Sequence, residues 1–144
     1  MLAGALLACT LAACVDGARR DEAAIGELIV SLVAADNRAD LDAVAALYAG
    51  DAVLLPPFES PVVGIDAIRD RYREMFETMG FELGATIEET VVEGNWAYSR
   101  GMTRGRAMPR DGQGWRSVND RYLMVLRKDG GRWHITRLMW NAEQ

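Results

Sequence analysis

The hydrophobic pattern of this chain changes its period once, at Gly80, and that change decides which folds are open to it. Before Gly80, apolar residues recur every three or four positions in three stretches, which is the period of helices with one buried face. After Gly80, apolar and polar residues alternate in segments separated by turn residues, which is typical of half-buried strands. Helices followed by hairpin-linked strands predict an α+β fold, with the helices packed on one face of a mostly antiparallel sheet.

Local signals place these elements along the chain. Asp21 and Asp40 are predicted caps of the first two helices, and Gly64 opens the third. The helices are expected over residues 22–35, from residue 41 to an end at Gly50, and from Gly64 to a stop at Gly80. The strands are expected at 51–55 with a return at 61–63, and then at 83–91, 96–107, 115–128 and 132–141.

Length and composition exclude several classes of protein. The chain has 144 residues, which predicts one domain. Its 16 basic and 21 acidic residues give a net charge of −5, whereas a nucleic-acid-binding domain usually has a basic face. No group of His, Cys, Asp and Glu has the spacing of metal ligands. We therefore expect no nucleic-acid partner, no metal and no cofactor.

The N-terminal segment gives information about the localisation of the protein. Residues 2–13 are apolar or small but too few to span a bilayer, which takes about 20 residues. The run Leu11-Ala12-Ala13-Cys14 resembles the lipobox of bacterial lipoproteins. That resemblance implies a signal segment at 1–13, a lipidated Cys14 that anchors the protein to the membrane in the cell envelope, and a linker at 14–21. Without lipidation the protein would be secreted, and the alternative is a buried N-terminal helix rich in Ala and Leu.

Four stretches further along carry a second resemblance. They are residues 40–56, 63–72, 96–101 and 130–141, which together resemble a SnoaL-like protein of the NTF2-like superfamily, closest to the DUF4440 group related to ketosteroid isomerase. The resemblance covers residues 22–142. It implies a cone, with three N-terminal helices packed against a strongly curved sheet and a pocket at the open end. Such proteins include isomerases, cyclases, dehydratases and binding domains, and they commonly form homodimers through the sheet.

The residues of the isomerase can be compared with this chain one at a time. Residues 37–48 align without gaps with the helices of the isomerase. On that alignment, the aspartate that acts as the isomerase's general base falls on Pro56, and its oxyanion tyrosine falls on Leu32. Neither residue can exchange a proton. The second oxyanion donor, a carboxylic acid kept protonated by an apolar site, falls on Asp120. We therefore do not expect steroid-type isomerisation by that mechanism.

Strand alternation indicates a candidate polar pair. The even positions from Val118 to Leu126 form an apolar row interrupted by Asp120, and the even positions of 96–107 include Arg100. A three-residue loop at 110–112 would place Arg100 and Asp120 diagonally on one face. Two interpretations remain open. They form a structural interior ion pair, or Asp120 is a pocket acid/base or ligand anchor and Arg100 tunes its pKa or holds an anion.

The remaining candidates are His134 and a set of aromatic residues. His134 is the only histidine, and it is expected on a strand face with Thr136, Leu138 and Trp140. It is a surface or packing residue, or it acts as a general base. Which face of that strand is concave stays open. The candidate pocket-lining residues are Tyr72, Trp96, Tyr98, Tyr122 and Trp140, with ordinary core packing as the alternative. A pocket of that composition suits a small apolar or aromatic molecule.

Three functional hypotheses follow. The first is an envelope-attached domain that binds a small apolar or aromatic molecule without catalysis. The second is a cofactor-independent isomerase, cyclase or hydrolase that uses Asp120 and Arg100, and also His134. The third is a domain for dimerisation or assembly.

Overall fold

The computed structural model describes the backbone of residues 5–142 and the side chains from Asp16 onward. The elements are α1 (Ala5–Arg38), α2 (Leu41–Ala45), β1 (Tyr48–Leu55), β2 (Val62–Val63), α3 (Ile65–Thr78), β3 (Met79–Glu93), β4 (Trp96–Pro109), β5 (Arg116–Asp129) and β6 (Arg132–Ala142). The six strands form one sheet in the order β2-β1-β6-β5-β4-β3. Every pair is antiparallel except β1 and β6, which are parallel.

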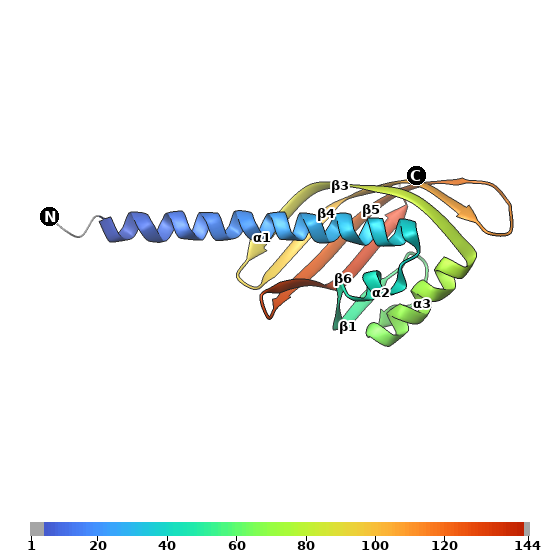
Figure 1. The fold of residues 1–144 in the computed structure, drawn as a ribbon, viewed down its shortest axis with the longest axis horizontal. Helices are drawn as coiled ribbons and strands as arrows, with labels where there is room; N and C mark the ends of the chain where they lie inside the picture. Colours follow the sequence, from blue (N-terminus) through green and yellow to red (C-terminus); the bar gives the residue numbers. More distant parts are fainter. Residues whose placement is uncertain (1–4, 143–144) are drawn as a thin grey trace.

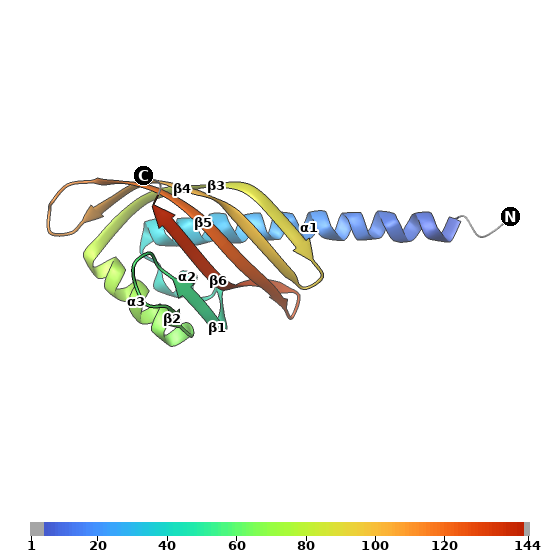
Figure 2. The ribbon, with the colours of Figure 1, turned by 180° about the vertical axis from the view of Figure 1, so that it is seen from behind.

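The sheet curves around the helices, which lie on one of its faces (Figures 1 and 2). The apolar stripe of α1 points into the sheet, and Ile25, Leu28, Ile29 and Leu32 are buried there. Residues from α3 and from the inner face of β5 and β6 complete a single core. The predicted α+β fold, with helices on one face of a curved and mostly antiparallel sheet, is confirmed.

The first helix is longer than predicted. It begins at Ala5 rather than after Asp21, so residues 14–21, expected as a linker, are helical. Asp21 does not cap a helix; its Oδ1 accepts hydrogen bonds from Lys128 Nζ at 2.6 Å and from Trp133 Nε1 at 3.0 Å. The physical reason is the composition, because alanine-rich sequence without proline extends a helix readily. Figure 1 shows the first part of α1 projecting beyond the sheet.

The predicted signal segment falls partly outside the described residues, as does the side chain of Cys14. The lipid anchor therefore stays a prediction. Between residues 5 and 142, no helix combines the length and the apolar character needed to cross a membrane.

The second helix is shorter than predicted and β1 is longer. Asp40 caps α2 as expected, since its Oδ1 accepts a hydrogen bond from Ala43 N at 3.0 Å. The chain becomes extended at Tyr48 because it pairs there with β6, and Ile135 N donates to Leu47 O at 2.8 Å. Strand pairing thus overrides the helical period of the last residues before Gly50.

An extra residue in β6 changes the face that its side chains occupy. Val125 pairs with Arg137 and Leu126 pairs with Ile135, so Thr136 is left unpaired as a bulge. Its buried Oγ1 donates to Val125 O at 3.0 Å.

The bulge determines which side chains of β6 lie on the concave face of the sheet. Trp133 and Ile135 are buried before it, and Leu138 is buried after it. The expectation that His134 shares a face with Leu138 and Trp140 is therefore wrong.

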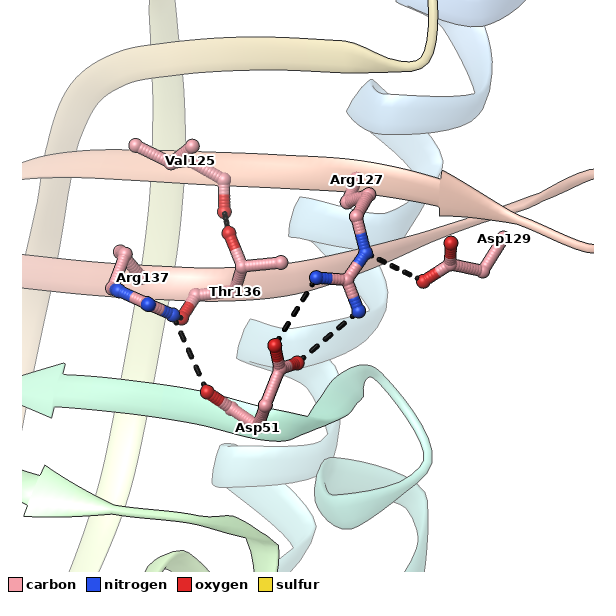
Figure 3. Close-up of polar contacts among 6 residues, drawn as sticks. All are labelled: Asp51, Val125, Arg127, Asp129, Thr136 and Arg137. Atoms are coloured by element: carbon pink, nitrogen blue, oxygen red, sulfur yellow. Dashed lines mark hydrogen bonds and ion pairs between the residues drawn. The ribbon is translucent and has the colours of Figure 1, made fainter.

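A polar cluster on the outer face ties β1 to the rest of the sheet (Figure 3). Arg127 of β5 donates to both carboxylate oxygens of Asp51 on β1, at 3.1 and 3.2 Å. Arg137 of β6 donates to the carbonyl oxygen of Asp51 at 3.3 Å, and Arg127 Nε donates to Asp129 at 2.8 Å. Because β6 lies between β1 and β5, the Arg127 side chain reaches across β6, links two strands that are not neighbours and helps to fix the position of β1.

Candidate functional site

A cavity of about 160 Å³ lies between α1, α3 and the inner face of the sheet. Most of its wall is apolar or aromatic. The apolar and aromatic lining residues are Ile29, Leu32, Val33, Leu54, Tyr72, Met75, Phe81, Leu83, Val118, Tyr122, Met124, Leu138 and Trp140. Three charged side chains also line it, namely Asp36, Arg71 and Asp120. Apolar walls with a few polar groups are the usual composition of a small-molecule pocket.

Asp36 is the residue that sequence reasoning missed. It lies near the end of α1, and its Oδ1 is buried with no hydrogen-bond partner in the part of the chain that the structure describes. Burial raises the pKa of Asp36 to about 7. The signal was present in the sequence, because Asp36 follows Leu32 by four positions and Val33 by three. A carboxyl group that continues an apolar helix stripe at this spacing points into the core.

Asp120 reaches the cavity from β5, where it pairs with Thr103 of β4. Burial raises the pKa of the Asp120 carboxyl above its ordinary value. Asp36 and Asp120 thus both hold a proton more tightly than an exposed aspartate does. A protonated carboxyl group donates one hydrogen bond and accepts another, so each of these groups, when protonated, can hold a carbonyl or hydroxyl group of a ligand or exchange a proton with it.

Arg100 is not a partner of Asp120, and the predicted pair is wrong. Arg100 lies on the outer face, where it donates to Glu89 at 2.9 Å and to Glu88 at 2.6 Å. The cause is the register, since Thr103 rather than Met102 pairs with Asp120. The connection between β4 and β5 is longer than the three residues assumed. A slip of one residue moves every side chain of a strand to the other face.

The same slip divides the aromatic candidates. The structure places Tyr72, Tyr122 and Trp140 in the wall of the cavity. Trp96 and Tyr98 are exposed on the outer face instead, so their predicted place in the pocket is wrong. There the guanidinium of Arg127 lies 5.6 Å from the centre of the Trp96 ring.

His134 does not belong to the cavity. It pairs with Arg127 near the start of β6 and is partly exposed, whereas Trp140 lines the cavity at the other end of the strand. A role for His134 as a general base in this cavity is therefore excluded by its position.

Three tyrosines extend the polar groups of the cavity into the core. The hydroxyl oxygens of Tyr48 and Tyr72 are 2.8 Å apart and share one hydrogen bond. Burial raises the pKa of both, and the nearby charge of Asp36 raises them further. The hydroxyl of Tyr122 is buried without a hydrogen-bond partner, although Ser99 is close enough to affect its pKa. These tyrosines stay protonated at neutral pH.

The part of the chain that the structure describes contains no set of metal ligands. No three His, Cys, Asp or Glu side chains among those residues come together in a way that could hold an ion. What the site offers is therefore an apolar cavity with two carboxyl groups and one guanidinium.

Comparison with known proteins gives consistent matches. The SnoaL-like domain family matches residues 29–135. A ketosteroid isomerase-like protein from Erwinia carotovora atroseptica is 31% identical with a TM-score of 0.79, over 85% of this chain and 95% of the other. A provisionally assigned aromatic ring hydroxylase from Novosphingobium aromaticivorans is 26% identical with a TM-score of 0.77, over 87% and 90%.

An NTF2-like protein of unknown function from Pseudomonas putida shares the fold, with a TM-score of 0.71 and 20% identity over 87% of this chain and 88% of the other. None of the curated proteins matches the chain. The fold predicted from the second resemblance, the NTF2-like cone, is confirmed.

Proposed function

The chain belongs to the SnoaL-like family of the NTF2-like superfamily, and we propose that its cavity binds a small, mainly apolar molecule. In this proposal a carbonyl or hydroxyl group of the ligand is held by Asp36 and Asp120. The observation that carries it is the buried Oδ1 of Asp36, which has no partner and lies in the wall of an apolar cavity. A buried polar atom left unpaired costs about 1–3 kcal/mol, so a ligand that pairs with it gains binding energy.

The size of the cavity limits the ligand. A dry apolar cavity of roughly 150 Å³ accepts a benzene molecule, and this cavity measures about 160 Å³. One ring with a short substituent therefore fits. The similar structures described as ketosteroid isomerase-like and as an aromatic ring hydroxylase favour a cyclic or aromatic ligand.

Acid–base catalysis is the second candidate, and the pKa of Asp36 favours it. A general acid or base works best when its pKa is close to the working pH, and that of Asp36 is about 7. A cofactor-independent isomerase, cyclase or hydrolase would then use Asp36 and Asp120. Arg100 and His134 play no part in this version because they lie outside the cavity.

Envelope attachment and dimerisation remain proposals that stand on other parts of the chain. Attachment rests on the lipobox-like run that ends at Cys14. Pairing of two copies, as a dimerisation or assembly domain, would use the outer sheet face, where Trp96, Tyr98, Leu123 and Met139 are exposed.

Calorimetric titration of the full chain with a panel of cyclic ketones, phenols, aromatic carboxylates and their amides tests the proposal. We expect a panel member to bind the wild type, and Asp36→Ala or Asp120→Ala to weaken it by about tenfold, since one lost hydrogen bond costs about 1–1.5 kcal/mol. Asp66→Ala, which changes an exposed residue of α3, is the matched control. No binding to the wild type, or binding that both cavity variants leave unchanged, contradicts the proposal.

Any compound that binds is then followed by NMR for turnover. Product formation that Asp36→Asn abolishes supports the enzymatic candidate. A ligand that binds and stays unchanged supports the binding domain.

A further inference from the structure

Among the described residues that line the cavity, Arg71 is the one with a positive charge. It lies on α3, and together with Met75 it also borders a separate hollow on the surface, next to Glu74 and Thr78. Arg71 and Met75 therefore stand between the cavity and the outside. A ligand that enters past α3 meets this guanidinium.

The guanidinium of Arg71 pairs with Glu59 in the same geometry that it would use to bind the carboxylate of a ligand. Arg71 Nη1 donates to Glu59 Oε2 at 2.6 Å, and Arg71 Nη2 donates to Glu59 Oε1 at 3.1 Å. Two parallel bonds from the flat guanidinium to one carboxylate form the pairing that makes arginine selective for such groups. The partner is thus a carboxylate that the chain itself supplies.

Glu59 sits on the exposed part of the loop between β1 and β2. Residues 56–61 connect β1 to β2, and Phe58, Glu59 and Ser60 are all exposed. Phe58 is fully exposed at a backbone φ of 62°, a conformation that costs energy for a bulky residue. The side chain of Glu59 is 51% exposed, against 29% for that of Arg71. The exposed partner can therefore leave while the guanidinium stays at the cavity.

The two aspartates of the cavity do not take the place of Glu59. Burial raises the pKa of each, whereas a close pairing with Arg71 would lower it. Below pH 7 the Asp36 carboxyl is mostly protonated and does not repel an anion inside the cavity. At mildly acidic pH the wall therefore offers a neutral carboxyl group inside and a positive charge at its edge.

We infer that the ligand of this cavity carries a carboxylate, which Arg71 binds in place of Glu59 while the apolar part of the ligand fills the cavity. This inference rests on the proposed binding function and adds the chemical class of the ligand. Entry of the ligand frees Glu59 and releases the loop at 56–61 from α3.

Titration of the full chain with trans-cinnamate and with cinnamamide tests the inference, because the two probes share one ring and differ in charge. At pH 6 we expect the wild type to bind cinnamate about tenfold more tightly, since hydrogen bonds to charged groups contribute more than neutral ones. Arg71→Gln should remove this preference and leave cinnamamide binding unchanged. Glu59→Gln should strengthen the binding of cinnamate only, because the internal competitor is gone.

Arg73→Gln is the matched control. Arg73 lies two positions along α3, pairs with Asp70 and is exposed, so its replacement should change neither titration. Backbone NMR shifts at 56–61 give an independent readout, and they should move with cinnamate but not with cinnamamide.

The titrations distinguish a failure of the carboxylate inference from a failure of the proposed binding function. If both probes bind the wild type equally and Arg71→Gln changes neither, the inference is wrong and the cavity remains a binding site. The same holds if cinnamate is preferred but the preference survives in Arg71→Gln. If neither probe binds the wild type or Glu59→Gln, and the wider panel also fails, the proposed function is wrong as well.

Discussion

Replacing Asp36 by Asn should change how the stability of this protein depends on pH. Burial raises the pKa of Asp36 to about 7 from an ordinary 3.8, so the folded state keeps a proton that the unfolded chain releases between these values. Because the folded pKa is the higher one, the stabilising contribution is complete below about pH 4 and is lost as the pH rises through 7. The difference between the folded and unfolded pKa values of Asp36, at about 1.4 kcal/mol per pH unit, corresponds to about 4 kcal/mol of stability.

Such a loss is large beside the 5–15 kcal/mol by which proteins are typically stable. Asn cannot ionise, so Asp36→Asn removes the loss at high pH but not the cost of a buried polar group. The free energy of unfolding of the variant, relative to wild type, should therefore rise by about 4 kcal/mol between pH 4 and pH 8.

Urea denaturation at intervals from pH 4 to pH 8 measures this difference. Asp66→Asn is the control because it removes an exposed carboxylate from the first turn of α3, and it should show no such rise. Parallel curves for Asp36→Asn and wild type would refute the reasoning, because they would mean that Asp36 titrates alike in the folded and unfolded chain.

Two further substitutions test other parts of the fold. Gly101→Ala should destabilise the protein by about 1–3 kcal/mol through overpacking, because a Cβ there would lie 2.0 Å from the carbonyl oxygen of Thr86; an unchanged urea midpoint would contradict the close approach of β3 and β4. Asp21→Asn should cost about 1 kcal/mol at pH 7 by weakening the bonds from Lys128 and Trp133. The bond from Lys128, the largest cause, lowers the pKa of Asp21, so this cost should fade below about pH 4, opposite in sign to the effect of Asp36, and an equal cost at pH 3 and pH 7 would count against the assignment.

The fold could be predicted because its signals are local. The change of period at Gly80 separates helices from strands, and Asp40 caps α2 through a bond to a residue three positions away. The beginning of α1 was missed because Asp21, a good cap by type, is engaged by residues more than a hundred positions further along. A cap signal loses its meaning when a distant partner takes the side chain.

The candidate site was harder to predict because it depends on register. Trp96 and Tyr98 were assigned to the cavity as aromatic residues, yet the inner row of β4 consists of small ones. At Gly101 and Gly105 a Cβ would lie 2.0 Å from a carbonyl oxygen of β3, so the curved sheet leaves no room for larger side chains there. A row of small residues therefore marks the inner face of this strand, and large aromatic residues mark the outer face.

Asp36 shows a different kind of miss. Its position on the apolar stripe of α1 is readable from the sequence, whereas strand alternation and the resemblance to the isomerase both point to a carboxyl group on a strand. That carboxyl group, Asp120, does line the cavity. The bulge at Thr136 had no such signal, because a threonine fits an ordinary strand equally well.

The unbroken course of α1 has a mechanical consequence. A helix rises about 1.5 Å per residue, so the stretch from Asp16 to Asp21, whose side chain bonds to β5 and β6, extends about 8 Å. A flexible tether would let the domain tumble about its point of attachment. A rigid rod continuous with the cavity wall instead transmits orientation, so any partner that grips the N-terminal part of α1 also determines which way the cavity faces.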